Sequence, residues 1–254
     1  LMPGSGTSTL SLDAAAGKTY PWAFVPGLPV AGQQEPNMNF EQARFNMVEQ
    51  QIRPWEVLDS RVLSLLEHIH REDFVPVRYR KLAFADLAIP LDNGQVMMRP
   101  KIEARMLQSL ELEADETVLE IGTGSGFVTA CLAGLAKRVV SVEIFEDLQE
   151  AAAVKLRDKN IENVELFVGD VMRGWQPEQA HDVVVVTGSV PEIPEQILGW
   201  VNPGGRLFVV TGESPAMEAR LLRRTGVTDW SVESLFETDL PRLVNSEEPP
   251  EFEF

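Results

Sequence analysis

The sequence predicts an α/β protein with a doubly wound, mostly parallel sheet, helices on both of its faces and a helical flank at its N-terminal side. From residue 117 onward, short runs rich in Val, Ile and Leu recur without polar alternation, which is typical of strands buried on both faces. Helical patterns separate the first three runs, and a glycine-rich turn follows the first. The predicted strands cover 117–121, 139–143, 164–168, 182–187 and 206–210, and the predicted helices cover about 126–136 and 146–159.

The residues before this sheet form two predicted parts. Residues 1–37 are rich in Gly, Pro, Ser and Thr without a sustained period, so we expect a flexible extension or an added tail. Residues 38–116 are expected to form a helical, substrate-facing segment. Its first helix would carry Phe45, Val48 and Ile52 on one face and end at Pro54.

Two further helices are expected in this segment, one capped by Asp59 or Ser60 and one starting after Pro100. Residues 117–254 are expected to form the ligand-binding domain, in one compact unit with 38–116. From about residue 216 the pattern favours a helix, a turn and then a strand through 232–236.

Composition narrows the classes of partner. The chain has 22 Lys and Arg against 39 Asp and Glu, a formal net charge of −17, which repels phosphate backbones and argues against a nucleic-acid partner. No run approaches the ~18 apolar residues of a membrane span, and no segment resembles a signal peptide. We therefore expect a cytoplasmic protein that does not bind membranes. The oligomeric state stays open.

The cysteine and histidines predict no chemistry of their own. Cys131 is the single cysteine and lies in the helix expected after the glycine-rich turn. We expect it to pack there as a small buried core residue. His68, His70 and His181 have no metal-binding spacing, so we expect no metal site.

The glycine-rich turn predicts a cofactor site. Gly122, Gly124 and Gly126 allow positive φ and close approach of a ligand to the backbone. Their spacing differs from the dinucleotide pattern G-x-G-x-x-G. Glu120, just before the first glycine, would repel a pyrophosphate and attract an ammonium and a sulfonium. These charges indicate S-adenosylmethionine.

Acidic residues follow the next two predicted strands. Glu143 ends the second strand about 20 residues after the loop, where a carboxylate can reach ribose hydroxyls. Asp170 follows the third strand and could accept a hydrogen bond from the adenine amine. Its alternative role is to cap or form a turn.

No Ser, Cys or His stands in a nucleophile–base pairing in the sequence. Methyl transfer to a carboxylate needs no general base, because a carboxyl group with a pKa near ~4 is already ionised at neutral pH. The protein need only align the reacting atoms and exclude water. The pattern therefore favours a carboxyl O-methyltransferase.

The motifs, in order, resemble those of protein-L-isoaspartate O-methyltransferases. They are Phe74-Val75-Pro76, Gly94-Gln95 with Pro100, the run 118–126, Gly169-Asp170 and Pro203-Gly204-Gly205-Arg206-Leu207. The resemblance covers about 38–244. It implies a class I, Rossmann-like methyltransferase fold, S-adenosylmethionine as donor, S-adenosylhomocysteine as product, and protein repair through methylation of the α-carboxyl of isoaspartyl residues.

The resemblance also assigns residues to parts of the cofactor. Glu120, Gly122 and Gly124 would line the methionine part, Glu143 the ribose, and Asp170 with Val171 the adenine. The expected cofactor-binding residues are Glu120, Ile121, Gly122, Thr123, Gly124, Ser125, Gly126, Glu143, Ile144, Asp170 and Val171.

The substrate loop departs from the family pattern G-Q-x-I-S-x-P. Here Met98 occupies the position of the family's Ser or Thr, and a thioether donates no hydrogen bond. Losing one such contact costs about 1–3 kcal/mol, or about ten- to a hundredfold in rate. Arg99 could replace the hydroxyl by binding a carboxylate, and Gln95, Val96 and Met97 are expected to contact substrate.

Three alternatives follow from Met98. It can be a core residue that leaves cofactor binding intact, the acceptor can be a small carboxylic acid or a hydroxyl compound, or the domain can bind the cofactor without catalysis. If the missing hydroxyl limits the reaction, Met98→Ser raises isoaspartyl activity.

Overall fold

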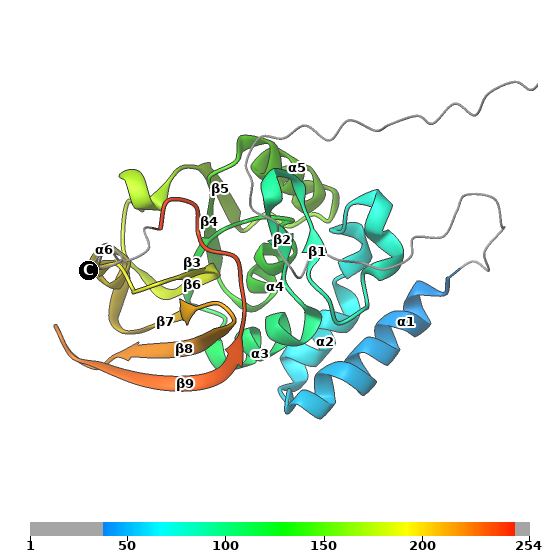
Figure 1. The fold of residues 1–254 in the computed structure, drawn as a ribbon, viewed down its shortest axis with the longest axis horizontal. Helices are drawn as coiled ribbons and strands as arrows, with labels where there is room; N and C mark the ends of the chain where they lie inside the picture. The colour runs from blue at the N-terminus through cyan, green and yellow to red at the C-terminus, as the bar shows by residue number, and fades with distance from the viewer. Residues whose placement is uncertain (1–37, 247–254) are drawn as a thin grey trace, which may run out of the picture. The chain divides into compact units, whose positions relative to one another are not determined.

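The computed structural model describes residues 38–246, and the predicted extension 1–37 lies outside this range. The described part is built around one seven-stranded sheet, with helices packed against it (Figure 1). No helix within 38–246 is long and apolar enough to cross a membrane. The predicted cytoplasmic location stays a prediction.

The sheet has the strand order β5-β4-β3-β6-β7-β8-β9. Its strands are β3 (Thr117–Ile121), β4 (Arg138–Glu143), β5 (Val164–Val168), β6 (His181–Val190), β7 (Val201–Glu213), β8 (Ala216–Arg224) and β9 (Trp230–Thr238). Strands β3 to β7 are parallel, and β8 is antiparallel to both of its neighbours. This confirms the mostly parallel, doubly wound sheet, in which the chain leaves β3 toward β4 and later returns to its other side at β6.

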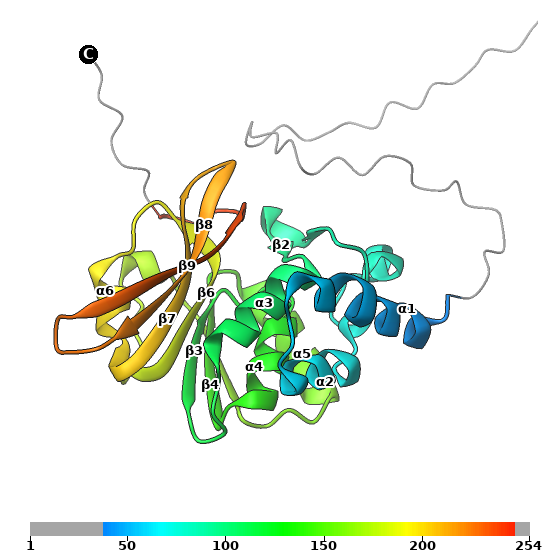
Figure 2. The same ribbon diagram turned by 90° about the horizontal axis from the view of Figure 1, so that it is seen from below.

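The two faces of the sheet are covered unequally (Figure 2). Most helices lie on one face, and α6 (Glu195–Gly199) lies on the other. Val118, Val139 and Val183 point into the larger core below the helices, whereas Leu119, Val140 and Val184 point toward α6. The alternation follows from the two-residue period of a strand. The helices after the first two strands are α4 (Phe127–Leu135) and α5 (Glu146–Asp158).

The N-terminal segment contains the three predicted helices. They are α1 (Phe40–Met47), which continues as a π-helical turn through Ile52, α2 (Ser60–His68) and α3 (Pro100–Leu110). The Asp59 carboxylate caps α2 by accepting from the backbone N–H of Arg61 at 2.8 Å. The expectation that Phe45 shares one face with Val48 and Ile52 was wrong, because Phe45 is 52% exposed whereas the other two are fully buried.

Between α2 and α3 the chain forms a short hairpin that the sequence did not predict. Strands β1 (Ile89–Pro90) and β2 (Val96–Met97) pair antiparallel, and Asn93 at the tip has a φ of 56°. The Asn93 amide donates to both carboxylate oxygens of Asp147 at 2.9 and 3.0 Å. The hairpin is thereby attached to the first turn of α5.

Two sequence predictions about the sheet were wrong. The predicted helix at 216 is strand β8, although its residues favour helix; Met217, Ala219 and Leu221 are buried at every second position, and the segment pairs with β7. Tertiary pairing here overrides intrinsic propensity. Strand β5 is not buried on both faces, because it is the edge strand and Phe167 is 38% exposed.

Candidate cofactor site

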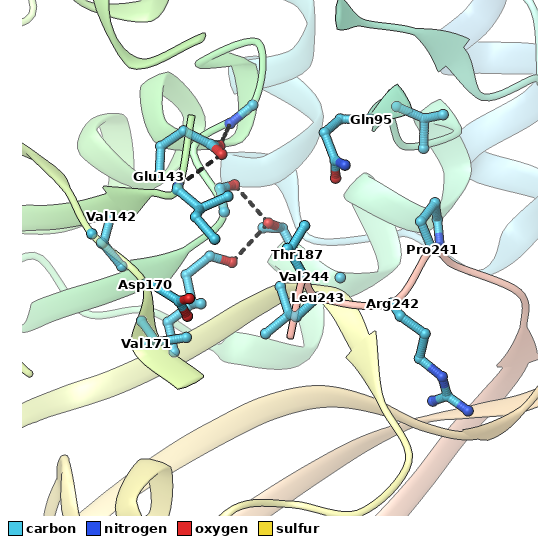
Figure 3. A pocket seen from close by; sticks show the side chains of 17 residues that line it. Gln95, Val142, Glu143, Asp170, Val171, Thr187, Pro241, Arg242, Leu243 and Val244 are labelled. Carbon is cyan, nitrogen blue, oxygen red and sulfur yellow. Dashed lines mark hydrogen bonds between the residues drawn. The ribbon is translucent and has the colours of Figure 1, made fainter. Parts of the chain in front are cut away.

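A cavity lies at the carboxyl ends of the central strands, where the strand order reverses, as is usual for ligand sites of open α/β sheets (Figure 3). It is lined by Gln95, Val96, Ile121, Gly122, Gly124, Val142, Glu143, Ile144, Gly169, Asp170, Val171, Thr187, Gly188, Pro241, Arg242, Leu243 and Val244. The parallel strands therefore bring together acids that are far apart in the sequence.

The glycine loop has the backbone that the sequence predicted. Gly122, Gly124 and Gly126 have φ values of 101°, 52° and 83°, a region that other residues rarely adopt. A β-carbon on Gly122 would lie 2.4 Å from Oγ1 of Thr187, and one on Gly126 would lie 3.0 Å from Cβ of Ala152. Two of the glycines are thus required by packing as well as by backbone conformation.

Thr187, in the second half of β6, fixes the start of this loop. Its hydroxyl lies 2.9 Å from the carbonyl oxygen of Ile121 and 2.6 Å from that of Gly122, and its one hydrogen is shared between these two acceptors (Figure 3). Because Gly122 and Thr187 both line the cavity, the bond joins two walls of the site.

Glu143 faces the loop from the end of β4. Its carboxylate accepts from the backbone N–H groups of Gly124 at 2.8 Å, Ile144 at 2.9 Å and Phe145 at 3.2 Å. Burial raises the pKa of Glu143 above its ordinary value, while the three N–H donors oppose this by favouring the anion. The side chain lies at the position where the sequence predicted the ribose-binding acid.

Asp170 follows β5 on the same edge of the sheet. Oδ1 accepts from the backbone N–H of Met172 at 2.9 Å, so the side chain caps the short helical turn 171–173. Oδ2 accepts from the side-chain amide of Asn245 at 2.6 Å. The capping role and the cavity position coexist, because Asp170 and Val171 also line the cavity.

Glu120 lies behind the loop, outside the lining of the cavity. It is fully buried, and Oε2 accepts from the hydroxyls of Thr129 at 2.5 Å and Ser141 at 2.6 Å. The Ser141 hydroxyl in turn lies 2.6 Å from that of Thr123 in the loop. Burial raises the pKa of Glu120 to about 8, with a smaller contribution from Glu143. The enclosed carboxyl supports the loop from behind and does not face the cavity.

The substrate loop presents different residues from those that its motif suggested. Gln95 and Val96 line the cavity, whereas Met97 and Met98 are each only 4% exposed and belong to the main core. Arg99 is exposed and outside the lining. The direct substrate contacts predicted for Met97, Met98 and Arg99 therefore gain no support from their placement.

A buried arginine holds this loop through its backbone. Arg71 is fully buried and donates to the carbonyl oxygen of Met98 at 2.7 Å, to that of Ala83 at 2.8 Å and to Glu103 Oε2 at 2.5 Å. Its guanidinium lies 5.0 Å from the ring centre of Phe127, the first residue of α4 after the glycine loop. Arg71 thus contacts both the substrate loop and the helix that follows the cofactor loop.

Several cavity residues were not predicted from the sequence. Thr187 lies within β6, directly after the apolar run 183–186, so a search for the first polar residue after such a run could have found it. Residues 241–244 carry no comparable signal. They reach the cavity only because the chain returns to the end of β6 after β9, where Ser189 pairs with Arg242. The Arg242 side chain points away from Glu143 and Asp170 (Figure 3).

No group of three metal-ligating side chains occurs among residues 38–246, so the described part offers no basis for a metal site. Cys131 is buried in α4, as predicted for a core residue.

The chain is similar to known proteins over most of its length. The family model described as protein-L-isoaspartate(D-aspartate) O-methyltransferase matches residues 42–239. A protein-L-isoaspartate O-methyltransferase 2 of Pelobacter propionicus is 36% identical over 210 residues, which are 82% of this chain and 93% of the relative. A protein-L-isoaspartate O-methyltransferase of Brucella anthropi is 38% identical over 202 residues, or 80% of this chain and 91% of the relative.

Solved structures agree with the fold. A Plasmodium falciparum protein described as a beta-aspartate methyltransferase in complex with S-adenosyl-L-homocysteine has a TM-score of 0.68 at 17% identity, covering 82% of this chain and 99% of the other. A structure described as a protein-L-isoaspartate O-methyltransferase has a TM-score of 0.66 at 25% identity, covering 78% and 65%. With the extent of the family match and the identities to its members, these findings show that the chain belongs to the protein-L-isoaspartate(D-aspartate) O-methyltransferase family.

Proposed function

We propose that this chain is an S-adenosylmethionine-dependent O-methyltransferase that methylates the α-carboxyl of isoaspartyl residues in damaged proteins. Family membership supports the reaction class. The observation in the structure that carries the proposal is that two carboxylates, Glu143 and Asp170, at the carboxyl ends of β4 and β5, line one cavity together with the glycine loop.

The residues present fit an adenosyl compound with a cationic centre. Gly122 and Gly124 line the cavity with positive φ and without a side chain, so their backbone is presented to a ligand. Glu143 would hold the ribose and Asp170 with Val171 the adenine. When bound, S-adenosylmethionine supplies a methyl group made electrophilic by its sulfonium.

The protein's own contribution to the reaction is positioning and exclusion of water. The acceptor carboxylate is ionised at neutral pH, so no side chain has to remove a proton. Gln95 and Val96 form the wall of the cavity that comes from the substrate loop, and residues 241–244 form another wall. Where the walls exclude water, the attraction between an anionic acceptor and a cationic donor is stronger.

The decisive experiment compares two peptides that differ only in an isoaspartyl or an aspartyl linkage, using methyl-tritiated S-adenosylmethionine. The isoaspartyl peptide should become labelled in a base-labile form, and its aspartyl twin should not. Labelling of neither peptide, with S-adenosylhomocysteine still bound in calorimetry, would contradict the isoaspartyl assignment and favour a binding module without catalysis.

One observation favours a second acceptor class. The wall formed by the substrate loop carries the apolar Val96, and the hydroxyl of the family motif is absent at Met98. A small carboxylic acid with an apolar substituent would suit this wall. Competition between such acids and the isoaspartyl peptide tests this alternative.

A further inference from the structure

The segment that follows β9 is attached to the end of β6. We call residues 240–246 the C-terminal strap. The backbone N–H of Ser189 donates to the carbonyl oxygen of Pro241 at 2.9 Å, the N–H of Leu243 donates to that of Ser189 at 2.9 Å, and the Ser189 hydroxyl donates to that of Leu240 at 2.8 Å. Because Ser189 is fully buried, the start of the strap is held firmly.

The middle of the strap forms a wall of the cofactor cavity. Residues 241–244 line the cavity opposite Glu143, and Leu243 lies close to Gly188, where a β-carbon would be 2.8 Å from Leu243 Cδ2 (Figure 3). The strap thus lies where it can contact both the cofactor and an acceptor. Its far end needs an attachment of its own, since the bonds to Ser189 involve only residues 240–243.

Asn245 supplies that attachment. Its Nδ2 donates to Asp170 Oδ2 at 2.6 Å, and its backbone has a φ of 64°, which asparagine tolerates better than most residues. Asn245 does not line the cavity, whereas Asp170 does. The contact therefore joins the strap to the carboxylate that faces the adenine end of the site.

The bond also fixes the direction of the Asp170 carboxylate. Oδ1 is used by the N–H of Met172 and Oδ2 by Asn245, and each carboxylate oxygen can accept a second bond. Arg173 is a charged neighbour of this carboxylate, with Nε 3.9 Å from Oδ2. Its side chain is 72% exposed, so the ion pair holds Asp170 only weakly. Without Asn245, Asp170 can rotate toward Arg173 and solvent.

We propose that Asn245 is a positioning residue of the cofactor site. It orients Asp170 for the exocyclic amine of adenine and keeps the strap closed over the cavity, and so links adenine recognition to the wall that an acceptor meets. This role rests on the proposed function, because it assigns adenine to Asp170.

The first test uses Asn245→Gly. Glycine permits the positive φ and removes the whole side chain, the amide included, so this variant removes the hydrogen bond without straining the backbone. The KM for S-adenosylmethionine and the Kd for S-adenosylhomocysteine should rise about tenfold, while kcat at saturating donor should change less than twofold. Hydrogen exchange at the Leu243 amide should become faster in the ligand-free protein, a readout that does not depend on catalysis.

A second pair of variants tests the contact itself. Asn245→Asp places a carboxylate against Asp170 and should weaken binding more than Asn245→Gly. The exchanged pair Asp170→Asn with Asn245→Asp restores one amide–carboxylate bond. Hydrogen exchange at the Leu243 amide should therefore slow toward the wild-type rate. Arg173→Gln is the matched control and should change Kd less than twofold.

The outcomes separate the two proposals. If the wild type binds S-adenosylhomocysteine and methylates isoaspartyl peptide while Asn245→Gly and Asn245→Asp stay within twofold of it, the role of Asn245 is refuted and the proposed function stands. If the wild type neither binds nor methylates, the proposed function fails. If hydrogen exchange at the Leu243 amide is as fast in the exchanged pair as in Asn245→Asp, the proposed contact between residues 170 and 245 is refuted.

Discussion

The hydroxyl of Thr187 occupies the space that a β-carbon on Gly122 would need, at 2.4 Å from it. The same hydroxyl bonds to the Gly122 carbonyl oxygen at 2.6 Å. Strand β6 and the glycine loop are therefore fitted to one another, and the absence of a side chain at 122 is a requirement of the protein itself as well as of its ligand.

Gly122→Ala should consequently damage the site. The new methyl group must displace Thr187, and alanine at a φ of 101° is strained by about 1–3 kcal/mol. We expect the affinity for S-adenosylhomocysteine to fall at least about tenfold in calorimetry, equivalent to 1.4 kcal/mol. Gly199→Ala is the control, because a β-carbon there meets nothing within 4 Å. Unchanged affinity in Gly122→Ala would contradict the close fit.

Glu143→Gln tests the ribose-binding assignment. The carboxylate accepts three backbone N–H groups, and an amide turns one of its two acceptors into a donor that faces these N–H groups. With one charge-assisted bond worth about 1.5–3 kcal/mol, we expect the KM for S-adenosylmethionine to rise about ten- to a hundredfold. The KM for peptide should change far less. A larger effect on the peptide than on the donor would place Glu143 on the acceptor side.

Glu120 predicts a pH dependence of stability. Its ordinary pKa of 4.5 rises to about 8 in the folded chain, so between these values the folded state keeps a proton that the unfolded state has lost. Stability from this group is therefore fully present below about pH 4.5 and is lost as the pH rises toward 8.

Glu120→Gln cannot ionise and should remove this loss. The difference in melting temperature between Glu120→Gln and wild type should shift in favour of the variant by at least about 2–4 °C from pH 5 to pH 8. This shift corresponds to about 1 kcal/mol. Glu56→Gln, at a side chain that is 84% exposed, serves as the control. A difference between Glu120→Gln and wild type that is constant over this range would mean that Glu120 is ionised when folded.

The placement of Met98 changes the expectation for a restored hydroxyl. Met98→Ser would put a hydroxyl into the core and leave a cavity, so we expect a loss of about 2–5 kcal/mol in stability and no gain in isoaspartyl activity. Val96→Thr is nearly isosteric and lies on the cavity wall. It should lower the KM for isoaspartyl peptide by about two- to tenfold. Higher activity in Met98→Ser than in Val96→Thr would show that residue 98 turns toward the substrate.

The sequence by itself determined the alternating strands and helices from β3 to α5, the glycine loop and the two acids at strand ends. These follow from local rules: apolar runs form buried strands, glycine permits positive φ, and parallel strands bring their carboxyl ends to one edge. The limits of β3 and β5 agree with the predicted ones to the residue.

The tertiary structure alone decided where the individual side chains of the site point. Glu120 alternates with Leu119 and Ile121, so it faces α4 and meets Thr129 instead of a ligand. Strand β8 forms because pairing with β7 outweighs helix propensity. The strap reaches Asp170 only after the chain has completed β9. Each of these depends on contacts between residues distant in the sequence, which local periodicity does not encode.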